Sequence, residues 1–179
     1  MNILVIIGVI VAIVGVILIV LINQYNKFQW YNTLLDKGEN NLINSLSKKF
    51  DILLRFLDFL KNNKVEVKED ELEDYKLLNT KQPINKLNKK VDELNNIVNK
   101  YMDNNEKLLK NETIIKLNKE LSEANISING GKKYYNDNLT IYNHLCNAFP
   151  SKIVAKLKKY KEKNFVDGEI KEELKILEE

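Results

Sequence analysis

The first apolar segment of the chain is continuous and carries no charge. It covers residues 3–22, ILVIIGVIVAIVGVILIVLI. A helix needs about 20 such residues to cross the roughly 30 Å hydrocarbon core of a bilayer. A cleaved signal peptide has a basic start, a shorter apolar core and a small-residue cleavage site, whereas only Met1 and Asn2 precede this run and Asn-Gln-Tyr-Asn follows it. The pattern therefore predicts an uncleaved transmembrane anchor over residues 1–23.

Two features of this run bear on its place in a membrane. Gly8, Ala12 and Gly15 fall on one helix face, where small side chains let a second helix approach closely. This predicts helix pairing in a homo-oligomer, although small residues are also common in such helices generally.

Lys27 and Lys37 follow the run, while no charged side chain precedes it. By the positive-inside rule, we expect a single-pass protein of the cell membrane with its body in the cytoplasm.

Beyond the run, apolar residues recur every three or four positions, as in amphipathic, coiled-coil-like helices that pack on one another. The first stripe comprises Leu42, Leu46, Phe50, Leu53, Leu57 and Leu60. The pattern reaches back through Trp30, so the anchor and this helix are expected to be continuous. The second stripe comprises Ile84, Leu87, Val91, Leu94, Val98 and Tyr101. The third comprises Ile114, Leu117, Leu121, Ala124, Ile128, Gly131, Tyr135, Tyr142, Leu145 and Phe149. Asn111 is the expected N-cap of the third helix, and Pro150 its stop.

Composition agrees with a helical fold. Six glycines and two prolines among 179 residues, with 30% charged residues, favour long helices over a turn-rich β fold. The predicted fold is all-α: a transmembrane helix followed by an antiparallel bundle of three to four long helices over residues 24–166, and a charged tail over residues 167–179. Helices joined by short turns must alternate in direction. The segment that follows Pro150 should then lie at the end of the bundle far from the bilayer.

Candidate catalytic and metal-binding residues are few. The chain has one histidine, His144, and one cysteine, Cys146, which lie two apart and so point to different faces of a helix. No Glu-x-x-His motif accompanies His144. The pair Gly130-Gly131 lies inside a helical pattern without the spacing of a phosphate-binding loop. We therefore expect no enzyme activity, no metal and no cofactor.

A dense basic run follows Pro150, although the formal charge of the whole chain is only +3. The run comprises Lys152, Lys156, Lys158, Lys159, Lys161 and Lys163. At the far end of the bundle it could not reach lipid headgroups, and no nucleic-acid recognition module accompanies it. The expected partners are the lipid bilayer, through residues 3–22, and another protein, rather than nucleic acid.

A paired Tyr-Asn repeat marks the third helix. Its members are Tyr135-Asn136 and Tyr142-Asn143, followed one heptad later by Phe149-Pro150-Ser151. The aromatic residues at this spacing are predicted to be core positions. Each asparagine sits one position from the apolar seam, where its amide can bond to a facing helix and fix the register. The alternative is a polar groove for a peptide ligand.

With this spacing, the segment ELSEANISINGGKKYYNDNLTIYNHLCNAFPSKIVA resembles the LemA family, whose last long helix carries the same repeat followed by Phe-Pro-Ser. Tyr31-Asn32, just after the apolar run, adds to the resemblance. The stretch DILLRFLDFL lacks the proline that the family usually has in its first soluble helix. The resemblance implies a bacterial, membrane-anchored protein with an antiparallel helical bundle and a short amino terminus outside the cell.

These features favour a non-enzymatic membrane scaffold or protein-interaction module. One alternative is a ligand sensor that transmits a rearrangement of the bundle along the helix continuous with the anchor, with Gly130-Gly131 as its hinge. A further alternative is an enzyme whose site lies between helices and depends on His144.

Overall fold

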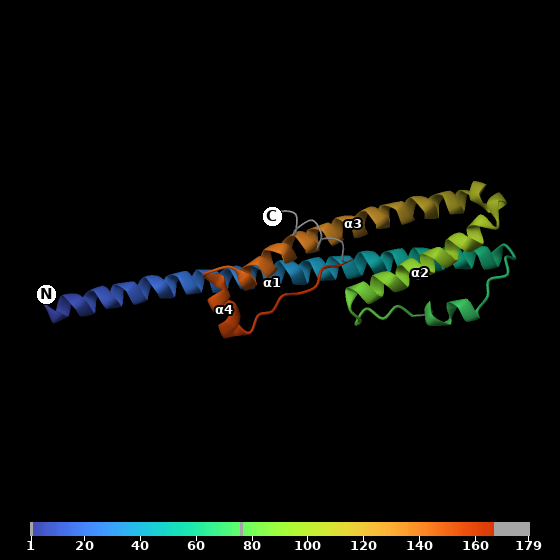
Figure 1. Ribbon diagram of the computed structural model, residues 1–179. Helices are drawn as coiled ribbons and strands as arrows, with labels where there is room; N and C mark the ends of the chain where they lie inside the picture. The colour runs from blue at the N-terminus through green and yellow to red at the C-terminus, as the bar shows by residue number, and fades with distance from the viewer. Residues whose placement is uncertain (1, 76, 167–179) are drawn as a thin grey trace, which may run out of the picture. The chain divides into compact units, whose positions relative to one another are not determined.

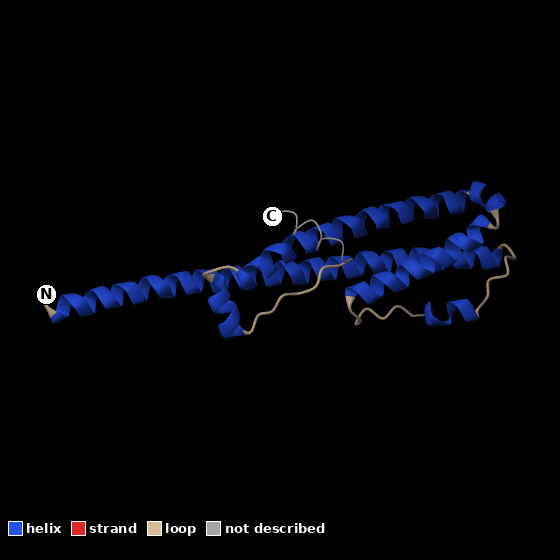
Figure 2. Cartoon of the chain, viewed as in Figure 1, coloured by secondary structure: helices blue, strands red, loops and turns tan. Residues whose placement is uncertain are grey.

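The computed structural model describes residues 2–75 and 77–166, which are all-α as predicted (Figures 1 and 2). Within this range the elements are α1 (Ile3–Asn62), the 3₁₀ helix η1 (Asp70–Tyr75), α2 (Ile84–Asp103), the 3₁₀ helix η2 (Glu106–Lys110), α3 (Glu112–Asn147) and α4 (Ser151–Lys158). The apolar run and the first soluble helix form one continuous helix, α1, as their pattern predicts. The predicted tail, residues 167–179, lies outside the described residues.

The chain divides into two compact units. The central unit is Gly38–Tyr134, and the terminal unit combines Met1–Lys37 with Tyr135–Glu179. Helices α1 and α3 contribute to both units, whereas α2 belongs to the central unit and α4 to the terminal unit.

Aliphatic layers form the core of the central unit. All six members of the first predicted stripe and all six of the second are buried. In the part of the third stripe that belongs to this unit, Ile114, Leu117, Ala124 and Ile128 are buried. Asn111 caps α3 as predicted, since its side-chain oxygen accepts a hydrogen bond from the backbone N–H of Thr113 at 2.9 Å. The periodic pattern therefore predicted the core of this unit.

The helices of the central unit do not simply alternate in direction, as the sequence had led us to expect. Lys49 contacts Asp92 near the middle of both helices, and the end of α1 and the end of α2 meet at η1, where Glu69 pairs with Lys61 and Glu71 with Lys100. Helix α2 therefore runs parallel to α1 (Figure 1).

The connection over residues 63–83 explains this topology. At about 3.3 Å per extended residue it can return along a helix of some 30 Å, so the next helix can start again from the other end. Helix α3 then runs antiparallel to α1, because Gly131 lies against Leu42 while Glu120 bonds Arg55. The expected alternation of direction is therefore wrong for α1 with α2 and for α1 with α3, and right for α2 with α3.

In the terminal unit, α1 begins with an exposed apolar surface. The large hydrophobic side chains between Ile3 and Val20 are exposed, as is Ile22. Among the described residues, α1 is the one helix long and apolar enough to cross a membrane. A continuous apolar surface of this length is unfavourable in water. It is suited either to a lipid bilayer or to a signal sequence.

Further along α1, the terminal unit has its own core. Phe28 and Leu35 of α1 are buried, as are Val154 and Ala155 of α4. Phe149 was expected to be a core residue, but it is 84% exposed. It follows the end of α3 at Asn147, and its peptide bond to Pro150 is cis. Since α3 has already ended, the heptad register no longer directs the Phe149 side chain toward α1.

Candidate functional site

The paired Tyr-Asn repeat lies on the part of α3 that belongs to the terminal unit. Tyr135 and Tyr142 are buried, as is Asn136, while Asn143 is partly exposed. The spacing of seven residues places the two pairs two helical turns apart on nearly the same face. The repeat thus presents two side-chain amides in a row along one side of the helix.

Both amides bind the backbone of the segment that returns after α4. The Asn136 side chain donates to the carbonyl oxygen of Val166 and accepts from its N–H, both at 3.0 Å. Asn143 makes the same pair of bonds with Lys163, at 2.9 and 3.0 Å. The sequence predicted bonds from these amides to a facing helix, and this partner is wrong. The amides instead bind a non-helical segment, whose backbone N–H and carbonyl groups have no helical partner there.

An aromatic cluster next to these bonds joins α1 to α3 and to the segment that follows α4. The ring of Phe28 meets the ring of Tyr142 edge-on, with centroids 5.7 Å apart, and lies 4.7 Å from the ring of Tyr160. Gln29 donates a hydrogen bond to the Tyr160 hydroxyl at 2.8 Å. The Lys158 ammonium lies 5.2 Å from the centre of the Tyr25 ring, within the range of a cation–π contact.

These contacts correct the predicted place of the basic run. The sequence led us to expect it far from the apolar run, whereas Lys158 and Tyr160 contact Tyr25, Phe28 and Gln29, only three to seven residues after Ile22. The parallel course of α2 brings this about, because α3 is then the helix that returns toward the start of α1. Lys163 also lies over the Tyr142 ring, at 5.2 Å.

Burial raises the pKa of two side chains of α3 in this region. Burial raises the pKa of Tyr142 to about 12, with smaller contributions from Cys146 and Tyr160. Burial also raises the pKa of the Cys146 thiol, and the charge of Glu162 adds to this. A raised pKa keeps the thiol protonated and weakens it as a nucleophile. His144 is exposed, whereas Cys146 is buried, so the structure does not bring the two together as a dyad.

The glycines singled out from the sequence differ in the space around them. A side chain added at Gly131 would meet Leu42 at 3.4 Å, whereas one added at Gly130 would meet nothing within 4 Å. Close helix approach thus accounts for Gly131 alone. Gly8 and Gly15 also have open space around them, and helix pairing through them and Ala12 stays a prediction.

A polar groove lies beside Gly130 and Gly131 in the central unit. Its volume is about 440 Å³, and it is lined by Gly38, Asn41, Asn44, Ser45, Ser127, Gly130, Gly131 and Tyr134. The hydroxyls of Ser45 and Ser127 hydrogen-bond to one another at 2.9 Å across it. These hydroxyls and amides are suited to a polar ligand such as a peptide backbone. Over the described residues, no group of three or more His, Cys, Asp or Glu side chains is placed to hold a metal ion.

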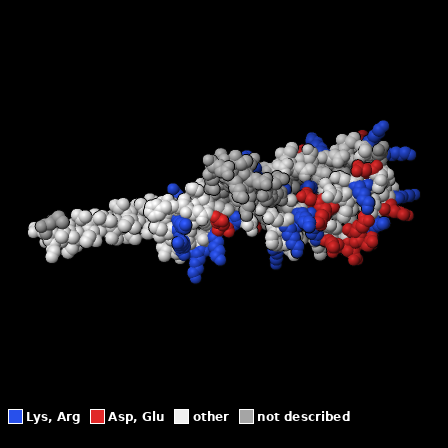
Figure 3. Space-filling view, in the orientation of Figure 1, with Lys and Arg blue, Asp and Glu red and all other residues white. Residues whose placement is uncertain are grey.

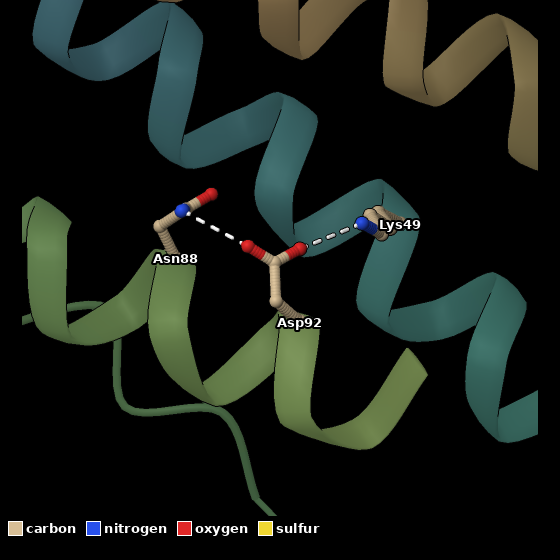
Figure 4. Close-up of polar contacts among 3 residues, drawn as sticks. All are labelled: Lys49, Asn88 and Asp92. Carbon is tan, nitrogen blue, oxygen red and sulfur yellow. Dashed lines mark hydrogen bonds and ion pairs between the residues drawn. The ribbon is translucent and has the colours of Figure 1, made fainter. Parts of the chain in front are cut away.

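An ion pair across α1 and α2 was missed by sequence reasoning (Figure 4). Lys49 is not a member of the apolar stripe of α1, yet it is only 7% exposed. Its ammonium donates to one carboxylate oxygen of Asp92 at 2.9 Å, and the Asn88 amide donates to the other at 3.1 Å. A buried lysine is stable only with such a partner. The pair fixes α2 against α1 in the central unit.

Comparison with known proteins agrees with the motif. The model of the LemA family matches residues 64–176, more than half of the chain, and the matched range includes both Tyr-Asn pairs and Phe149-Pro150. No curated protein and no solved structure matches the chain. On the strength of the family match, the chain belongs to the LemA family.

Proposed function

We propose that this LemA-family protein is a single-pass membrane protein that presents a non-enzymatic helical module to other proteins. The observation that carries the proposal is the unbroken course of α1 over Ile3–Asn62. Its first part exposes an uncharged apolar surface, and its later part supplies buried residues to the folded body. One helix is therefore suited both to enter lipid and to support the body outside it.

The anchor is tested by the mature protein itself. If residues 3–22 anchor the protein, intact-mass measurement of the protein from cell membranes retains them, and alkaline carbonate does not extract it. A protein that begins after residue 23 would identify a cleaved signal sequence and contradict the anchor.

The cytoplasmic side is a separate part of the proposal. Lys27 and Lys37 follow the apolar run, and positive charge near a span favours the cytoplasm. The test places one cysteine at Asn104, an exposed position after α2, in a Cys146→Ser background. We expect a membrane-impermeant thiol reagent to label it only after the cells are permeabilised. Labelling in intact cells would place the body outside.

The interaction role rests on apolar residues on the outer face of α3. Ile115 and Ile126 are 57% and 69% exposed, and their separation of eleven residues puts them on one side of the helix. A photo-crosslinking residue at Ile126 should give a discrete adduct with another protein in cells. The matched control is Asp51, an exposed polar position on α1 of the same unit. Equal adducts at both positions, or none at either, would contradict an interface here.

A sensor is the second candidate, and the polar groove beside Gly130 and Gly131 favours it. A sensor that bends α3 at this point needs the bare backbone. Gly130→Ala has space for its methyl group and should stabilise the helical conformation by roughly 0.5–1 kcal/mol, which opposes bending. If the Ile126 adduct forms equally in the wild type and in this variant, the bending role is wrong.

A further inference from the structure

The segment from Phe149 to Lys163 combines exposed apolar side chains with exposed lysines. Ile153 and Leu157 lie one turn apart on one face of α4 and are 42% and 71% exposed, whereas Val154 and Ala155 are buried on the other side. Phe149, just before α4, is also exposed. All six lysines of the basic run are exposed. Apolar residues bordered by lysines are the composition of helices that lie at a membrane surface.

The packing of the terminal unit brings this segment to the end of the apolar run. Lys158 and Tyr160 contact residues 25–29 of α1, which follow Ile22 by roughly 5 to 10 Å along the helix axis. Figure 1 shows the turn from α3 into α4 beside α1. The headgroup layer on each side of the hydrocarbon core is about 5 to 8 Å thick. Lys158, which lies over the Tyr25 ring, is therefore at the depth of lipid phosphates when residues 3–22 span the core.

The charge distribution selects the kind of lipid. In the face shown in Figure 3, lysines gather on the part of the terminal unit that holds α4, and the first part of α1 carries no charge. Glu162 is the only acidic residue between Phe149 and Val166, and it accepts a hydrogen bond from Asn147. Such a surface attracts anionic phosphates and gains little from zwitterionic headgroups.

We propose that α4 with its flanking lysines is a second membrane contact, which binds anionic phospholipid headgroups of the leaflet at the end of the anchor. This inference rests on the proposed membrane anchor. Each lysine near an anionic surface strengthens association about fivefold, and the exposed Ile153 and Leu157 add contact with the upper part of the acyl chains. The contact would fix the body at the bilayer and make its position depend on lipid composition.

The test uses the full-length protein in nanodiscs of two compositions: phosphatidylcholine alone, and equal parts of phosphatidylcholine and phosphatidylglycerol. An environment-sensitive fluorophore is attached at Leu157→Cys in a Cys146→Ser background. We expect its emission to shift to the blue in the anionic discs only, and high salt to reverse part of the shift by screening the lysines.

Two charge-matched variants isolate the contact. Replacing Lys152, Lys156 and Lys161 by glutamine should weaken the interfacial association on the order of 100-fold and abolish the shift. Replacing Lys107, Lys110 and Lys119, which are exposed lysines of the central unit, should leave it unchanged. An equal effect of the two triple variants would show general charge attraction and overturn the proposal.

Other outcomes separate this inference from the proposed function. A protein that inserts in both kinds of disc without a lipid-dependent shift would overturn the lipid contact while the anchor stands. A protein that fails to insert in either disc would overturn the anchor first. A shift that requires two copies per disc, whatever the lipid, would assign the surface to self-association.

Discussion

The terminal and central units share two helices but are held together in different ways. In the central unit a third long helix, α2, completes aliphatic layers at a spacing of three and four residues. In the terminal unit the third partner is the short helix α4 with the non-helical segment after it, held by the amides of Asn136 and Asn143 and by the ring of Phe28. Where no long helix supplies apolar layers, amide bonds to backbone and aromatic contacts take their place.

The comparison of the two units also explains where the paired Tyr-Asn repeat falls. Both Tyr-Asn pairs belong to the terminal unit. A heptad of aliphatic residues suffices for helix packing and can be met by many sequences. Holding a non-helical segment by its backbone requires a side chain that both donates and accepts, at the right position. The Tyr-Asn repeat thus lies in the unit whose packing places the stricter demand on residue type.

The largest expected effect comes from removing the Phe28 ring, which joins α1 to α3 and to the segment after α4. Phe28→Ala should lower the stability of the terminal unit by about 3–5 kcal/mol, since Phe28 is fully buried between Tyr142 and Tyr160. Trp30, the sole tryptophan, reports on this unit during urea unfolding. Hydrogen exchange of the α2 amides should change little, and the control Leu53→Ala should show the reverse pattern. Equal changes in both units would mean that they unfold as one.

Alkaline pH should weaken the terminal unit next. The pKa of Tyr142 is about 12 in the folded chain and about 10 when unfolded, so its stabilising effect is complete below pH 10 and is lost as pH rises toward 12. The expected loss is on the order of 2 to 3 kcal/mol. It is measured as the drop in the urea midpoint of Trp30 fluorescence. In Tyr142→Phe this part of the pH dependence should vanish; a full alkaline loss in that variant would assign it to another group.

The two asparagines of the repeat should differ from one another. Asn136→Ala leaves the buried N–H and carbonyl of Val166 without their side-chain partner and should destabilise by roughly 2 kcal/mol. Asn143→Ala exposes the backbone of Lys163 to water, which can replace the bonds, and should destabilise by about 1 kcal/mol or less. Hydrogen exchange of the Val166 and Lys163 amides measures both. Similar losses would show that burial does not govern the strength of these bonds.

The ion pair of the central unit should show the smallest of these effects and an asymmetric one. Asp92→Ala leaves the buried ammonium of Lys49 unpaired and should cost about 1 to 2 kcal/mol. Lys49→Met should be nearly neutral, since the Asp92 side chain is half exposed and water can solvate it. Hydrogen exchange of the α2 amides reports both. If Lys49→Met lowers stability more than Asp92→Ala does, the attraction between Lys49 and Asp92 outweighs the cost of removing the lysine from water.

The sequence predicted the helices and most of their buried residues because burial on one side of a helix leaves a period that can be read directly. Every member of the stripes at Leu42–Leu60 and Ile84–Tyr101 is buried. The direction of α2 was missed because residues 63–83 have no such period, and a turn was assumed where a long return is present. The length of that connection was the feature of the sequence that could have indicated the parallel direction of α2.

The partners of the site residues were harder to predict. An asparagine that bonds a backbone group places no demand on the identity of its partner, so nothing in the residues at Lys163 and Val166 marks them. Lys49 shows the same limit, since its burial depends on a carboxylate on another helix. The predicted position of the basic run depended on the predicted topology. The error about the direction of α2 therefore put the run at the far end of the bundle, whereas it lies next to the apolar run.

The terminal unit is assembled from the two ends of the chain, which has a consequence for synthesis on the ribosome. Phe28 and Leu35 are made early, yet the residues that cover them come from position 135 onward. At 5–20 residues per second, about 130 residues of further translation take roughly 6 to 26 seconds. The central unit, which is contiguous, can fold within that interval. The nascent chain must therefore keep an uncovered apolar face until the residues from position 135 onward emerge, a period in which chaperones can bind that face.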